Sequence, residues 1–96
     1  MKEVALFFGD ANIEVANKLL EEITSIIDAG SFIPIKGVWR GTLEHSYMLI
    51  LSEEEFQRCK EKIIRTLKKY EQEALFILYI GEGYLLYTHA EEEVVV

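Results

Sequence analysis

Few residues of this 96-residue chain could perform acid–base chemistry at neutral pH. Glu44, His45 and His89 are the ones that could combine as general acid and base, because imidazole titrates near neutrality. Glu44 and His45 are neighbours in an expected strand, so their side chains point to opposite faces and cannot pair directly. A catalytic pair would therefore need His89 or a second subunit, and surface or turn-end positions are the simpler interpretation.

Trp39-Arg40-Gly41 is the most site-like cluster of the chain. An indole beside a guanidinium at a strand end can bind an anion or stack on a planar ring. The simpler alternative packs Trp39 in the core and leaves Arg40 free at a turn. The candidate ligand or partner site comprises Asp10, Asn12, Trp39, Arg40, Glu44, His45 and His89, provided that the sheet order brings these residues close.

The chain lacks a phosphate loop, a nucleotide-binding glycine pattern, Cys or His metal spacing and a nucleophile elbow. Gly81-Glu82-Gly83 stands between two expected strands, which predicts a hairpin loop because a dinucleotide site needs a following helix. The single cysteine, Cys59, lies on the apolar face of an expected helix and is predicted to be a buried structural thiol. We therefore expect no cofactor and no metal.

Seventeen acidic against ten basic residues give a net charge of −7 at pH 7, which disfavours nucleic acid as a partner. A basic stripe on the second expected helix is interleaved with acids, as in an ordinary solvated face. It consists of Arg58, Lys62, Arg65 and Lys69.

The first apolar segment, residues 4–8, is too short for a signal peptide, and no run is long enough to span a membrane. We expect a cytoplasmic protein.

Hydrophobic periodicity predicts two helices and five strands in one domain, residues 1–96. Asp10 or Asn12 caps the first helix, which is expected to end at Gly30, and a capping box of Ser52 and Glu55 starts the second. The strands are expected at Val4–Phe8, Phe32–Trp39, Leu43–Leu51, Leu75–Ile80 and Tyr84–Thr88. Residues 90–96 are expected to be a flexible tail or a strand added to a neighbouring edge.

The order of these elements predicts an α+β, two-layer sandwich. It is the ferredoxin-like β-α-β-β-α-β arrangement with an extra C-terminal strand, in which both helices cover one face of an antiparallel sheet. Pro34 cannot donate to a strand ladder, so the second strand should lie at an edge.

The strands are apolar on both faces, although two helices can cover only one. The second face would expose more apolar surface than a soluble monomer usually tolerates, so we expect a partner, most simply a second copy in a symmetric dimer. The expected interface comprises Phe7, Tyr47, Leu49, Tyr79, Tyr84 and Leu86.

Three segments, Phe8-Gly9, Gly37-Val38-Trp39-Arg40 and Tyr70-Glu71-Gln72-Glu73, resemble a small bacterial ferredoxin-like domain family of unknown function. Its members similarly run from a strand-end aromatic-Gly pair, through a Trp-Arg hairpin, to a helix ending in Gln-Glu. The resemblance implies the same topology and brings no activity with it.

These observations favour a non-catalytic, homo-oligomeric binding or regulatory module of a prokaryote or its virus. Its protein partner or small ligand would be held at the apolar sheet face or in the subunit cleft. The alternative is a small-molecule enzyme of the dimeric α/β-barrel type using His45, His89, Glu44 and Arg40. Nucleic-acid binding through the basic helix face is a third, less favoured class.

Overall fold

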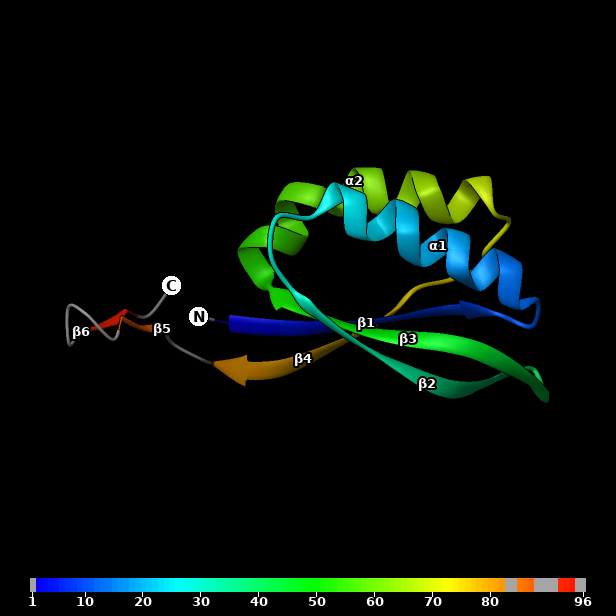
Figure 1. Ribbon diagram of the computed structural model, residues 1–96, viewed down its shortest axis with the longest axis horizontal. Coiled ribbons are helices and arrows are strands. Elements are labelled where there is room, and N and C mark those ends of the chain that lie inside the picture. Colours follow the sequence, from blue (N-terminus) through cyan, green and yellow to red (C-terminus); the bar gives the residue numbers. More distant parts are fainter. Residues whose placement is uncertain (1, 83–84, 88–91, 95–96) are drawn as a thin grey trace.

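Two helices lie on one face of a four-stranded antiparallel sheet in the computed structural model, which describes residues 2–82, 85–87 and 92–94 (Figure 1). The elements are β1 (Lys2–Asp10), α1 (Ile13–Ile26), β2 (Ser31–Trp39), β3 (Thr42–Ser52), α2 (Glu53–Lys69) and β4 (Phe76–Glu82). The sheet order is β2-β3-β1-β4, and every neighbouring pair is antiparallel. The predicted α+β class, with two helices on one face of an antiparallel sheet, is therefore confirmed.

The hairpin of β2 and β3 follows the local chemistry of its residues. Among the described strands, β2 lies at the edge of the sheet and pairs only with β3, so the missing N–H of Pro34 is tolerated there, as predicted. Arg40 and Gly41 form a two-residue turn with φ of 50° and 80° between the paired residues Trp39 and Thr42. Positive φ at both central positions matches the twist of a tight hairpin, so the predicted turn is also confirmed.

The C-terminal part of the expected topology is wrong. Gly81 and Glu82 do not form a hairpin loop but continue β4, where they pair with Glu3 and Lys2. β5 (Leu85–Tyr87) pairs with β6 (Glu92–Val94) in a separate two-stranded sheet beyond the end of β4 (Figure 1). Residues 83, 84, 88–91, 95 and 96 of the expected loop, strand and tail lie outside the described residues.

The core lies between the helices and one face of the sheet. Its buried residues are Val4, Leu6, Phe8, Ala16, Leu19, Ile23, Tyr47, Leu49, Leu51, Phe56, Cys59, Ile63 and Leu67. Cys59 is 1% exposed and its Sγ lies 3.6 Å from the carbonyl oxygen of Ile26, as expected for a structural thiol. Burial raises the pKa of this thiol, which further disfavours a nucleophilic role.

The helix starts are those expected from the sequence, but one helix end is not. The amide of Glu14 donates to Asn12 Oδ1 over 2.9 Å, and the amide of Glu55 donates to Ser52 Oγ over 3.1 Å. α1 ends at Ile26, well before Gly30. The Glu55 carboxylate accepts from the amides of Asp28 and Ala29 and so stabilises the chain just after α1. A side chain from α2 therefore stabilises the turn that a glycine was expected to make.

Candidate functional site

The face of the sheet away from the helices, here called the open face, is apolar along all four strands. Strand register places on it Phe7, Ile33, Ile35, Met48, Ile50, Phe76 and Leu78. Phe7 alternates with the core residues Leu6 and Phe8, and it is paired with Met48 on one side and Phe76 on the other. Phe76 is 61% exposed and Leu78 is 46% exposed. The prediction of a sheet that is apolar on both faces is therefore confirmed.

Some of the residues expected on the open face lie elsewhere. Tyr47 and Leu49 are buried in the core against the helices, and Tyr79 is paired with Val4 on that same side of the sheet. The reason is strand register: β3 is aligned with β1 so that Leu49 lies opposite Leu6. Phe7 lies on the open face as expected. Tyr84 and the side chain of Leu86 lie outside the described residues.

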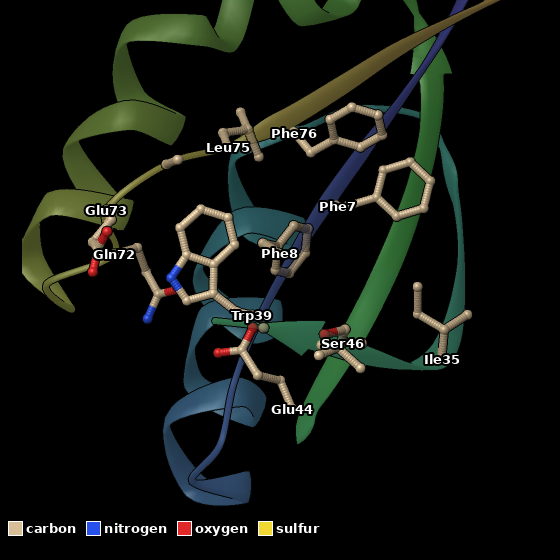
Figure 2. Close-up of a pocket in the computed structure, with 14 residues that line it drawn as sticks. Phe7, Phe8, Ile35, Trp39, Glu44, Ser46, Gln72, Glu73, Leu75 and Phe76 are labelled. Atoms are coloured by element: carbon tan, nitrogen blue, oxygen red, sulfur yellow. The ribbon is translucent and has the colours of Figure 1, made fainter. Parts of the chain in front are cut away.

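A pocket of about 470 Å³ opens in this surface near the end of β1 (Figure 2). Its floor is made of Gly9, Gly37 and Ser46, from three adjacent strands. A Cβ on Gly9 would collide with Ser46 and with the carbonyl oxygen of His45, and a Cβ on Gly37 would lie 2.6 Å from Ser46 Oγ. The close approach of Ser46 therefore requires glycine at both positions, and two glycines and a serine leave no large side chain to fill the pocket.

The walls of the pocket are aromatic and aliphatic. The rings of Phe7 and Phe76 lie side by side, with centroids 5.3 Å apart, and Ile35 and Leu75 also line the pocket (Figure 2). Trp39 closes another side and is 44% exposed. The alternative that packed Trp39 in the core is therefore wrong, and the indole is available to a ligand.

Arg40 and Glu73 form an ion pair at the rim. Arg40 Nη2 lies 2.9 Å from Glu73 Oε2, and the guanidinium carbon lies 5.5 Å from the centroid of the Trp39 ring. The pair joins the β2–β3 hairpin to the connection between α2 and β4, residues 70–75. Arg40 is thus engaged by a carboxylate, which weakens the expectation that it binds an anionic ligand.

Glu44 is the other carboxylate that lines the pocket. It lies on β3 next to Gly37, and its carboxylate is turned toward Trp39 (Figure 2). Burial raises the pKa of Glu44 above its ordinary value of 4.5, and the negative charge of Asp10 raises it further. The pocket therefore combines an apolar body with a partly desolvated acid at one end.

The structure brings together only part of the predicted site. Trp39 and Glu44 line the pocket and Arg40 lies at its rim. Asp10 ends β1, where its carboxylate accepts from the amide of Asn12 and from the Gln72 side chain.

The other predicted site residues lie elsewhere. His45 points to the opposite side of the sheet from Glu44, as expected, and its Nδ1 lies 3.3 Å from Lys36 Nζ. Asn12 uses its side chain to cap α1. His89 lies outside the described residues.

Acid–base, nucleophilic and metal-binding residue types did not predict most of the pocket lining. The lining contains glycines, phenylalanines and a serine, whose types alone do not indicate a binding site. A signal was nevertheless present in the three segments of the family resemblance. Phe8-Gly9, Gly37-Val38-Trp39 and Gln72-Glu73 are far apart in the sequence, and all of them line this pocket.

Comparison with known proteins identifies the fold and no family. No family model matches the chain, and no curated protein matches it. The resemblance to a small bacterial family therefore stays a prediction.

Two solved structures are similar. The de novo designed protein Foldit4 has 15% identity and a TM-score of 0.54 over 85% of this chain and 96% of its own. The periplasmic divalent cation tolerance protein CutA from Archaeoglobus fulgidus has 15% identity and a TM-score of 0.49 over 81% of each chain. The first likeness supports the α+β fold alone.

Two further features of the described residues bear on function. No group of three or more metal-ligating side chains is found among them. None of the helices within residues 2–82 combines the length and apolar character needed to cross a membrane.

Proposed function

We propose that this protein is a non-catalytic, homo-oligomeric binding module that holds a small, largely apolar ligand in the pocket of the open face. The observation that carries the proposal is a floor of Gly9, Gly37 and Ser46 beneath walls that include Phe7 and Phe76. At about 470 Å³ the pocket falls in the range of small-molecule sites, which are mostly apolar with a few polar groups.

The homo-oligomer is supported by the rest of the open face. Ile33 and Leu78 are 47% and 46% exposed, and neither lines the pocket. A chain with a net charge of −7 repels a second copy at most of its surface, so two copies would meet most easily at a mainly apolar face. Symmetric dimers are the commonest soluble oligomers, and a shared apolar face suits one.

The enzyme alternative finds less support. It required Glu44, His45, His89 and Arg40 to act together, but Glu44 and His45 lie on opposite sides of the sheet and Arg40 is paired with Glu73. Glu44 and Glu73 both line the pocket, but Glu73 is engaged in the ion pair with Arg40, which disfavours an acid–base role for the two carboxylates together.

Nucleic-acid binding is weakened in a similar way. Arg58 pairs with Glu55 and Asp28, and Lys69 pairs with Glu22. Two of the four cations in the basic stripe are therefore partly neutralised by neighbouring acids.

Ligand binding can be tested with the neutral fluorophore N-phenyl-1-naphthylamine. Trp39 is the single tryptophan and lines the pocket, so energy transfer from it reports on bound fluorophore, and the Phe7→Ala variant tests whether the pocket is the binding site. We expect saturable binding that Phe7→Ala weakens and that Leu78→Ala, elsewhere on the open face, leaves intact. Binding that fails to saturate, or that both variants weaken equally, would contradict a defined pocket.

Oligomerisation can be tested by size-exclusion chromatography with light scattering. We expect a dimer that Leu78→Glu dissociates. Leu43→Glu is the matched control, because Leu43 is 70% exposed but lies on the other side of the sheet. A wild-type monomer at micromolar concentration would contradict the homo-oligomer and leave the pocket proposal standing.

A further inference from the structure

The charges at the pocket are unequally compensated. Glu73 is paired with Arg40, and Asp10 accepts hydrogen bonds from Asn12 and Gln72. The side chain of Glu44 has neither a hydrogen bond nor an ion pair with any residue in the described part of the chain. The pocket therefore presents one partly buried carboxylate whose charge a ligand could balance.

The surroundings of Glu44 favour a cation over other ligands. Its carboxylate is turned toward the face of the pocket that Trp39 closes, and indole attracts cations more strongly than other aromatic rings do (Figure 2). An anionic ligand would meet the like charges of Glu44 and Asp10, and a neutral one would leave Glu44 without a partner. A positive group would gain from the carboxylate, and from the indole on the side that the Arg40 guanidinium does not cover.

The geometry points to a ligand class: a small molecule with an apolar or aromatic body and one ammonium group. The body would pack against Phe7 and Phe76, and the ammonium would lie between Glu44 and Trp39. This inference rests on the proposed pocket function and adds the chemistry of the ligand to it.

Three probes with a phenyl ring and a short chain separate charge from shape: phenethylammonium, phenethyl alcohol and 3-phenylpropionate. Binding is measured by calorimetry and by Trp39 fluorescence. We expect phenethylammonium to bind about tenfold more tightly than the alcohol, as a charge-assisted hydrogen bond implies. The propionate should bind most weakly.

Glu44→Gln tests whether the Glu44 carboxylate causes the preference for the ammonium probe, because the substitution keeps the shape of the side chain and removes its charge. We expect this variant to bind the ammonium and the alcohol equally, with its affinity for the alcohol unchanged. Glu21→Gln is the matched control: it removes the same charge from an exposed position on α1 and should retain the preference. Circular dichroism confirms that both variants are folded, and if Glu44→Gln is not, the wild-type probe series decides the ligand class.

The outcomes separate this inference from the function on which it rests. If none of the three probes and no neutral fluorophore binds the wild type, the pocket proposal itself is overturned. If the alcohol binds as tightly as the ammonium, or if Glu44→Gln keeps the preference, the cationic ligand is overturned while the apolar binding pocket stands.

Discussion

The side-chain amide of Gln72 donates a hydrogen bond to Asp10 Oδ2 over 2.9 Å and so joins the α2–β4 connection to the end of β1. One residue later, Glu73 binds Arg40 and joins the same connection to the β2–β3 hairpin. Residues that follow a helix are thereby attached to two strands of the sheet. The rim of the pocket depends on these two links, and the first of them is partly buried.

Replacing Gln72 with alanine should therefore weaken both the fold and the pocket. We expect Gln72→Ala to lower the free energy of unfolding by about 1 kcal/mol, the usual net value of one hydrogen bond, because Asp10 loses a donor. Urea denaturation measures the loss, and probe titration measures the accompanying fall in affinity. Gln57→Ala, at an exposed position on α2, should change neither. Equal stabilities of the two variants would show that the Gln72–Asp10 bond contributes nothing.

The pocket floor should tolerate no added side chain at Gly9. Gly9→Ala introduces a Cβ that collides with backbone atoms of β3, so we expect a loss of about 1–3 kcal/mol in the free energy of unfolding, typical of overpacking. Gly41→Asn is the comparison: its Cβ meets no atom of the described residues within 4 Å, and asparagine tolerates positive φ. Thermal or urea unfolding of both variants tests this. A smaller loss for Gly9→Ala than for Gly41→Asn would contradict the steric explanation.

Affinity for the ammonium probe should depend on pH through Glu44. Burial and the charge of Asp10 raise the pKa of Glu44 in the free protein, and a bound cation favours the ionised carboxylate. Affinity should therefore be constant above this raised pKa and fall as pH is lowered through it. Asp10, Arg40 and Glu73 are also charged groups near the pocket. The pH dependence of the wild type must therefore be compared with that of a variant that lacks only the Glu44 charge.

The control for that experiment is Glu44→Gln, for which ammonium affinity should vary much less over the same pH range. The affinity of the wild type for phenethyl alcohol should also stay nearly constant, because a neutral ligand has no preference for the ionised acid. If the wild type and Glu44→Gln lose ammonium affinity equally as pH is lowered, another carboxylate causes the pH dependence.

Stability in acid should depend on Glu55. The guanidinium of Arg58 and the backbone amides of Asp28 and Ala29 hold the pKa of Glu55 at about 2, against an ordinary value of 4.5. A pKa depressed by folding contributes stability that is fully present above 4.5 and is lost as pH falls toward 2. Glu55→Gln should be less stable than the wild type at pH 7, and the difference should shrink between pH 4.5 and 2. Denaturation at several pH values measures it, and a difference that stays constant would contradict this account.

Local chemistry alone determined several features of this protein. Asn12 and Ser52 cap helices because their side-chain oxygens reach amides two or three residues away. Pro34 excludes its strand from the sheet interior, and Arg40-Gly41 forms a turn between strands already in register. Each of these predictions depended on residues close together in the sequence, and each was confirmed.

Contacts between distant segments decided the rest. Glu55 could have completed its own capping box, but it binds the amides of Asp28 and Ala29, which the packing of α1 beside α2 brings within reach. α1 ends at Ile26, and the contact that stabilises the chain after it involves a residue too distant in the sequence to be predicted.

The sequence by itself determined that both faces of the sheet are apolar, because strand side chains alternate with a period of two. It could not determine which face the helices cover, because that depends on the register of β3 against β1. Only the tertiary structure placed Leu49 in the core and aligned Gly9 with Ser46, which left a hollow between Phe7 and Trp39. The physical reason is that a pocket floor consists of missing side chains, and their absence matters only once three strands lie side by side.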